Sequence, residues 1–246
     1  MGTISLGTMG WSYPFWVGKL YAPKTESRQF LEVYAQHFNT VEINNTFYRI
    51  PRISTVKLWT SQTPAEFQFA VKMPRKITHV HPLQINDYAS HFFEVITHFR
   101  EKLGPILIQF PPTFSDDHLV SLQDFIHQLP QAFRYAMEFR NHTLLSDHVY
   151  SLLRDNSIAL VLADRPRYPH IDCVTSTFVY IRWEGDRRII TGDSGHVEQD
   201  RGKDLAKWAR LLRSYQQQEL NIFGYFSKFY SGYPPADIEQ LKRFLE

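Results

Sequence analysis

Eight short apolar segments recur along the chain, and most of them are followed by a stretch with helical periodicity. This alternation predicts parallel strands that are joined by helical crossovers. Eight such units within 246 residues match the size of a TIM barrel. The alternative is an open doubly wound sheet, but no glycine-rich phosphate-binding turn follows any of the strands. We therefore predict an α/β fold with a single TIM (β/α)8-type barrel domain over residues 1–246.

The strands are predicted from apolar runs and from alternation of apolar and polar residues. Residues 105–110 are nearly all apolar, as in a strand buried on both faces, and Pro111-Pro112 ends this strand. The segment that begins at residue 40 alternates instead, with Val41, Ile43 and Asn45 on one face and Glu42, Asn44 and Thr46 on the other. The other predicted strands are residues 4–10, 67–73, 133–139, 158–163, 178–183 and 221–226.

The helices are predicted where apolar residues recur three and four positions apart. Residues 165–177, between the sixth and seventh strands, carry only a poor helix signal. Residues 76–81 are predicted to form a loop. The predicted helices are residues 27–37, 54–62, 88–103, 116–128, 146–156, 203–217 and 236–245.

Composition limits the class of protein. Hydrophobic residues make up 43% of the chain and charged residues 21%, as in an ordinary globular protein. The net charge of +2 is too small to argue for nucleic acid by itself. The single cysteine, Cys173, and the lack of a signal peptide indicate a reducing, cytoplasmic setting. No apolar run is long enough to cross a bilayer, so no membrane partner is expected, and the oligomeric state is left open.

Polar side chains share one face of the predicted strands. In a barrel, one parity of each strand points inward and the other packs beneath the helices. The polar parity gathers charges near the carboxyl ends of the strands, where active sites of TIM barrels lie. Because the signs alternate, a purely structural ion network is also possible, but so many charges at one end favour a site. The predicted inner cluster is Glu42, Lys72, Glu138, Arg140, Asp164 and Arg182, with Asn44 and Gln109 on the same faces.

The first functional hypothesis is a small anionic ligand, bearing phosphate or carboxylate, at the mouth of the barrel. Lys72, Arg140 and Arg182 would hold the anion, and arginine can do so with two hydrogen bonds. The reaction would be metal-free acid–base chemistry of the hydrolase or lyase type. Glu42 or Glu138 would be the general base. His79 would shuttle protons, because imidazole titrates near neutrality; the alternative for His79 is an ordinary loop histidine.

A second hypothesis is a divalent-metal phosphoesterase or nucleic-acid-binding protein. Glu42, Glu138 and Asp164 could supply oxygen ligands to Mg²⁺ or Mn²⁺. Against this, no strand carries an inward histidine, and each carboxylate has a cation available. His79 and His81 stand alone in their segment, so a zinc site is not predicted. The sequence therefore predicts neither a metal site nor another cofactor.

A third hypothesis is a binding module without catalysis. Trp11, Tyr13 and Trp16, together with Phe47 and Tyr48, could form an aromatic platform that stacks a ring, a sugar or a nucleobase. The alternative is that these rings form the hydrophobic lid of the barrel. For Trp16 we expect a lid that also touches ligand.

Several motifs resemble those of the DUF72 (YecE-like) family, a group of uncharacterised proteins with a TIM-barrel fold. The resemblance covers almost the whole chain and implies the fold, but it implies no established reaction. The chain departs from the family pattern at residues 227–235, where family members tend to carry an Asn-rich, His-containing turn before Gly-x-x-Pro. The matching motifs are Gly10-Trp11-Ser12-Tyr13 with Trp16 and Tyr21, Val41-Glu42-Ile43-Asn44 with Thr46-Phe47-Tyr48, Ala70-Val71-Lys72 with Thr78-His79, Gln109-Phe110-Pro111-Pro112, Glu138-Phe139-Arg140, Asp164, and Tyr180-Ile181-Arg182 with Gly185.

Overall fold

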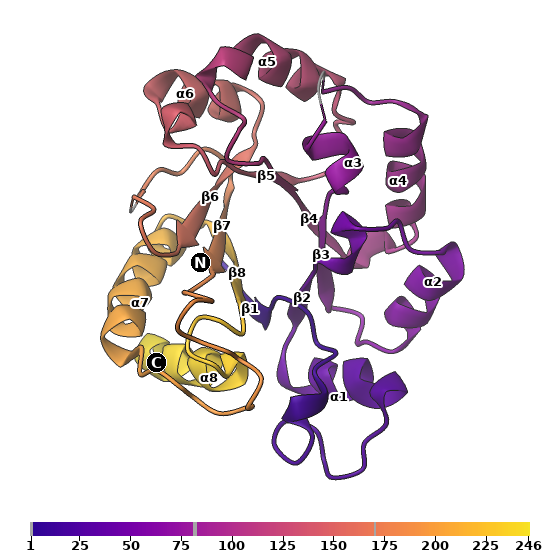
Figure 1. The fold of residues 1–246 in the computed structure, drawn as a ribbon, viewed down its shortest axis with the longest axis vertical. Coiled ribbons are helices and arrows are strands. Elements are labelled where there is room, and N and C mark those ends of the chain that lie inside the picture. Colours follow the sequence, from indigo (N-terminus) through magenta and orange to yellow (C-terminus); the bar gives the residue numbers. More distant parts are fainter. Residues whose placement is uncertain (1, 81–82, 170) are drawn as a thin grey trace. The chain divides into compact units, whose positions relative to one another are not determined.

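The computed structural model describes residues 2–80, 83–169 and 171–246, in which strands and helices alternate along the chain (Figure 1). The described residues form one sheet of eight strands in the order β1-β8-β7-β6-β5-β4-β3-β2. The strands are β1 Ile4–Thr8, β2 Thr40–Ile43, β3 Gln68–Lys72, β4 Leu103–Gln109, β5 Tyr135–Glu138, β6 Ala159–Asp164, β7 Phe178–Trp183 and β8 Asn221–Phe226. This strand order confirms the predicted α/β fold of the TIM-barrel type.

The helices lie between the strands in the order expected for helical crossovers. The α-helices are α1 Phe30–His37, α2 Ile53–Ser61, α3 Arg75–Thr78, α4 Asp87–Thr97, α5 Leu119–Gln128, α6 Asp147–Asp155, α7 Gly202–Gln217 and α8 Pro234–Leu245. The described residues between β6 and β7 contain no helix, as the poor helix signal there predicts.

The chain divides into two compact units, and each is described by itself. The first comprises Met1–Glu42, Leu162–Ile171 and Phe178–Glu246, and the second comprises Ile43–Val161 and Asp172–Thr177.

In the first unit, β8 lies between β1 and β7 and pairs with both in parallel. Helices α7 and α8 pack against each other and against β8 (Figure 1). Gly224 of β8 is required by close packing, because a Cβ atom there would lie 2.5 Å from the ring of Trp183. The Trp183 ring in turn stacks on Phe226, with ring centroids 4.1 Å apart. This apolar layer anchors the strands that carry the charged residues of the unit.

In the second unit, β3, β4, β5 and β6 pair in parallel in that order. One face of β4 is apolar, and Ile106 and Ile108 are fully buried. Helices α2 and α4 contact each other beside these strands (Figure 1). Helix α4 begins where the Asn86 side chain accepts a hydrogen bond from the backbone N–H of Ala89, at 3.1 Å. The carboxyl ends of three neighbouring strands, β3 to β5, are thereby placed side by side.

Three local predictions are wrong. The segment predicted as a loop over residues 76–81 contains the one-turn helix α3, which begins after Pro74 and buries Ile77; His81 lies outside the described residues. The helix predicted over residues 88–103 ends at Thr97, because Leu103 already belongs to β4. The alternation that begins at residue 40 ends at Ile43, and a 3-10 turn, η3 (Asn45–Phe47), follows.

Candidate functional site

The polar ends of β3, β4 and β5 form a continuous chain of hydrogen bonds. The ammonium group of Lys72 donates to Oε1 of Gln109 at 2.8 Å. The amide group of Gln109 donates to Oε1 of Glu138 at 2.7 Å. Gln109 and Glu138 are direct partners in the sheet register, which confirms that these side chains share one face. We call Lys72, His79, Gln109, Glu138 and Arg140 the Lys72 cluster.

Arg140 extends this chain to a more accessible position. Its Nε donates to the same oxygen of Glu138 at 3.0 Å, and 29% of its side chain is exposed, against 1% for Glu138. The buried carboxylate is therefore held by an amide and a guanidinium, as a buried charge requires. Glu138 carries the charge that balances the cations around it, and its proposed role as a general base stays a prediction.

The turn η3 places an aromatic ring over Lys72. The ammonium group of Lys72 lies 4.1 Å from the centroid of the Phe47 ring, a cation–π contact. The hydroxyl of Thr46 donates to the backbone carbonyl of Lys72 at 2.6 Å, which fixes the turn against β3. Asn44, predicted on the polar strand face, is half-buried and begins this turn by accepting the backbone N–H of Phe47 at 3.1 Å.

His79 lies at the end of α3 beside these groups. Its ring is 5.1 Å from the Phe47 ring in an edge-to-face arrangement, and its Nδ1 lies 2.8 Å from the Thr78 hydroxyl. Burial lowers the pKa of His79, and the charges of Lys72, Arg75 and Arg140 lower this pKa further. The imidazole is therefore neutral at neutral pH.

We predict that Lys72→Met raises the pKa of His79, because one of the cations that disfavour the imidazolium is removed. An NMR titration of the imidazole C–H resonances would measure this shift, with His79→Asn used for assignment. Lys57→Met, an exposed lysine on α2, is the matched control. If the pKa of His79 were unchanged in Lys72→Met, Lys72 would not lie close enough to His79 to act on its imidazole.

A hollow of about 480 Å³ lies beside η3 in the same unit. Arg49 and Arg52 line it together with Tyr48 and Trp59, and none of its lining residues is a carboxylate. Tyr48 is 71% exposed. Sequence reasoning missed both arginines, although the short spacing in Arg49-Ile50-Pro51-Arg52 was a usable signal. This surface adds positive charge next to the turn that covers Lys72.

Glu42 and Arg182 form a buried ion pair in the first unit. The guanidinium of Arg182 donates to both carboxylate oxygens of Glu42, at 3.0 Å each. The hydroxyl of Tyr180 also donates to Glu42, at 2.8 Å. Arg182 further donates to Glu184 at 2.7 Å. This geometry supports a structural role for the pair, and the expected roles of Glu42 as a base and Arg182 as an anion clamp stay predictions.

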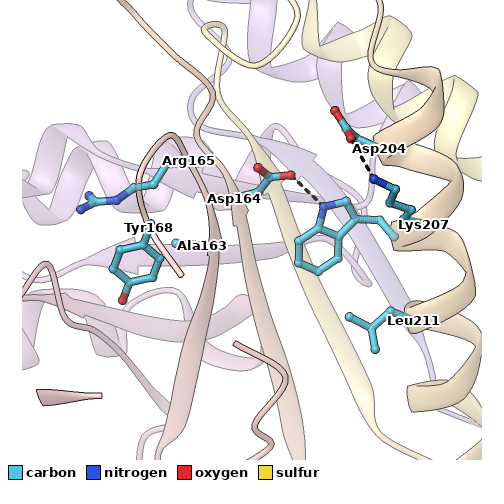
Figure 2. A pocket seen from close by; sticks show the side chains of 8 residues that line it. Ala163, Asp164, Arg165, Tyr168, Asp204, Lys207 and Leu211 are labelled. Carbon is cyan, nitrogen blue, oxygen red and sulfur yellow. Dashed lines mark hydrogen bonds and ion pairs between the residues drawn. The ribbon is translucent and has the colours of Figure 1, made fainter. Parts of the chain in front are cut away.

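Asp164 has partners other than the charges predicted for it. Its Oδ2 accepts a hydrogen bond from the indole Nε1 of Trp208 at 2.8 Å (Figure 2). The hydroxyl of Tyr230 lies 3.5 Å from the same oxygen. The strand β6 ends at Asp164, where the side chain meets α7, so the structure does not join it to the Glu42–Arg182 pair.

The aromatic residues of the predicted platform differ in how deeply they are buried. Trp16 is fully buried and packs against Tyr13 and Tyr21, with ring centroids 4.5 and 6.0 Å apart, and its expected contact with a ligand stays a prediction. Burial, with the charge of Glu42 nearby, raises the pKa of Tyr13 to about 12. Its hydroxyl donates to the carbonyl of Met9 at 2.6 Å. Trp11 is partly exposed, and its carbonyl accepts a hydrogen bond from Tyr21.

Two general features bear on the alternatives. Across residues 2–80, 83–169 and 171–246, no three side chains of His, Cys, Asp or Glu are grouped as a metal site would require. None of the helices in these ranges has the length and apolar character needed to span a bilayer.

Comparison with known proteins identifies relatives of this chain. A model of the family "Protein of unknown function DUF72" matches residues 5–246. YecE of Escherichia coli K12 is 34% identical over 139 residues, which are 56% of this chain and 48% of YecE, so the match spans about half of that relative. YunF of Bacillus subtilis is 28% identical over 236 residues, covering 88% of this chain and 80% of YunF.

Solved structures show the same fold. A DUF72 family protein of Thermotoga maritima has a TM-score of 0.81 at 24% identity, with 99% of each chain covered. A DUF72 family protein of Enterococcus faecalis has a TM-score of 0.73 at 21% identity, covering 99% of this chain and 95% of that one. The resemblance seen in the motifs is confirmed: the chain belongs to the DUF72 family.

Proposed function

We propose that the Lys72 cluster binds a small anionic ligand that bears phosphate or carboxylate. The observation that carries the proposal is that two cations, Lys72 and Arg140, are held at the two ends of one hydrogen-bonded chain through Gln109 and the buried carboxylate of Glu138. Like charges repel, so such an arrangement costs free energy unless negative charge is held there. Glu138 supplies one negative charge to the cluster, and the phosphate or carboxylate of a bound ligand would supply further negative charge.

The neighbouring surface supports the same sign of ligand. Arg49 and Arg52 line a hollow without carboxylates, and η3 links this hollow to Lys72 through Thr46. Guanidinium groups suit phosphate and carboxylate because they donate two parallel hydrogen bonds. An anion at Lys72 would therefore meet a positive surface on its way in, which favours its association.

The acid–base chemistry in this proposal belongs to His79. A half-buried imidazole that is neutral at pH 7 can accept a proton and return it, which metal-free hydrolases and lyases both need. The Nδ1 atom is near Thr78, so Nε2 is the atom that would exchange a proton with the ligand. The proposal places the protein in a reducing, cytoplasmic setting, in keeping with the free thiol of Cys173.

The test is to measure the binding of inorganic phosphate and of phenyl phosphate by isothermal titration calorimetry in the presence of EDTA. We predict that Lys72→Met weakens binding by about 10- to 100-fold, because a hydrogen bond to a charged group contributes about 1.5–3 kcal/mol. Lys57→Met should bind as the unaltered protein does. Equal affinity in Lys72→Met and the unaltered protein would refute the proposal.

The divalent-metal phosphoesterase is the competing function, and it needs a separate measurement. The metal content of freshly purified protein, prepared without chelators, can be measured by mass spectrometry. Stoichiometric Mn, Mg or Zn, or phosphate binding that is lost in EDTA and restored by Mn²⁺, would favour that function over the metal-free one. A protein that binds anions equally well with and without EDTA supports the metal-free proposal.

A further inference from the structure

A second cavity, of about 430 Å³, lies in the first unit at the end of β6. Figure 2 shows Asp164 between the loop residues Arg165 and Tyr168 on one side and helix α7 on the other. None of its lining residues belongs to the Lys72 cluster or to the Glu42–Arg182 pair. The cavity therefore needs an explanation of its own.

The cavity wall on α7 is a complete helical stripe. Asp204, Lys207, Trp208 and Leu211 all line it, and their spacing of three and four residues places them on one face of the helix. A stripe of this kind on a helix of an α/β fold ordinarily packs against a neighbouring element. Here the facing residues, Arg165 and Tyr168, belong to a connection whose described residues contain no helix. At these residues the stripe therefore borders a cavity.

The charge that faces this space is the carboxylate of Asp164. Its Oδ2 accepts from the indole of Trp208 at 2.8 Å, with the Tyr230 hydroxyl at 3.5 Å. Both donors are neutral, so they fix the carboxylate without compensating its charge. Among the described residues, no ion pair to Asp164 is found, and its Oδ1 has no hydrogen-bond donor. A half-buried carboxylate in this state favours a cationic partner.

The two cations that line the cavity, Arg165 and Lys207, interact with groups other than Asp164. The guanidinium of Arg165 lies over the Tyr168 ring, 4.7 Å from its centroid, and points away from Asp164 in Figure 2. Lys207 lies 3.8 Å from Asp204 on its own helix. Asp204 adds a second carboxylate to the lining. The rest of the wall is apolar or aromatic, with Leu211 and the Trp208 ring.

We propose that this cavity binds a small organic amine, with its ammonium group on the Asp164 carboxylate and its apolar body against Trp208 and Leu211. The volume of the cavity lies in the range of small-molecule sites, which combine apolar walls with a few precisely placed polar groups. An ammonium can donate to the open Oδ1 while Trp208 keeps Oδ2. The proposal is independent of the anion site.

The experiment uses phenethylamine, a primary amine with an apolar body, and follows the indole N–H resonance of Trp208 in ¹⁵N-labelled protein. Trp208→Phe assigns that resonance. We expect saturable shifts of the Trp208 signal with phenethylamine, and at least tenfold weaker binding of the neutral 2-phenylethanol and of the anionic phenylacetate. Asp164→Asn keeps an oxygen for the indole hydrogen bond and removes the charge, and it should weaken amine binding at least tenfold. Asp155→Asn, an exposed aspartate on α6, is the control and should bind normally.

Leu211→Trp provides a second variant, which fills the cavity and leaves Asp164 in place; it should also abolish amine binding. The proposal is overturned if phenethylamine does not bind at millimolar concentration, or if phenylacetate or 2-phenylethanol binds equally well. It is also overturned if folded Asp164→Asn binds phenethylamine like the unaltered protein. If Asp164→Asn does not fold, undiminished binding by Leu211→Trp overturns the proposal, and its loss of binding supports it.

Discussion

Replacing Arg182 with methionine should lower the free energy of unfolding by about 3–5 kcal/mol, the usual cost of removing one partner from a buried ion pair. Glu42 is fully buried and Arg182 is 3% exposed, so neither charge can be solvated in the folded state. Without the guanidinium, the Glu42 carboxylate loses both hydrogen bonds from Arg182 and keeps the one from the neutral hydroxyl of Tyr180, at 2.8 Å. Urea denaturation followed by circular dichroism measures the loss.

Two further variants test whether the loss of stability comes from leaving the buried Glu42 carboxylate without its cation. Glu42→Leu combined with Arg182→Met should recover much of the loss, because replacing a whole buried pair by apolar residues is often neutral. Arg188→Ala removes the exposed guanidinium that pairs with Asp186 and should leave the unfolding midpoint nearly unchanged. If Arg182→Met were as stable as Arg188→Ala, the pair would not have the structural role that its geometry supports.

Much of the fold could be predicted because the side-chain period of a strand is two residues. The bounds of β7 and β8 agree with the predicted strands at residues 178–183 and 221–226. The same parity rule placed Lys72, Gln109 and Glu138 on one face, and the structure joins them by hydrogen bonds of 2.8 and 2.7 Å. A buried face leaves little freedom of register, so sequence alone is informative there.

The rest of the site depends on where strands end, which the alternation does not encode. The polar pattern continues beyond Ile43, but Thr46 donates to the backbone of Lys72 and the chain turns into η3. Asp164 has the parity of an inner residue, yet it is bound by the indole of Trp208, which lies on helix α7, 44 residues further along the chain. Contacts of this kind are decided by tertiary packing, and local propensity does not predict them.

Asp237 should make the protein less stable as the pH rises from about 4 to about 7. This residue lies in the first turn of α8, is 3% exposed, and accepts a hydrogen bond from the Ser231 hydroxyl at 2.6 Å. Burial raises its pKa from 3.8 to about 7, although the Ser231 hydrogen bond and Arg201 oppose the change. The helix N-terminus also favours the charged form, but only by about 0.3–1 kcal/mol.

The sign follows from proton binding. Between pH 4 and pH 7 the unfolded chain has lost the proton of Asp237 while the folded protein keeps it. The folded state then binds more protons, so its stability falls as the pH rises. The rise in the pKa of Asp237 from 3.8 to about 7 corresponds to a loss of about 4 kcal/mol in the free energy of unfolding, and this loss is complete above the folded-state pKa.

Asp237→Asn should therefore be more stable than the unaltered protein at pH 8, by up to about 4 kcal/mol, and similar to it at pH 4. The asparagine oxygen can still accept the Ser231 hydroxyl, so the main change is the removal of the titrating group. Urea denaturation at several pH values measures both curves, and Glu239→Gln, an exposed acid on the same helix, is the control. A profile for Asp237→Asn that runs parallel to that of the unaltered protein from pH 4 to pH 8 would show that Asp237 is ionised in the folded state. The burial of its carboxylate would then be compensated by Arg201 and the helix N-terminus, and the Ser231–Asp237 contact would be charge-assisted.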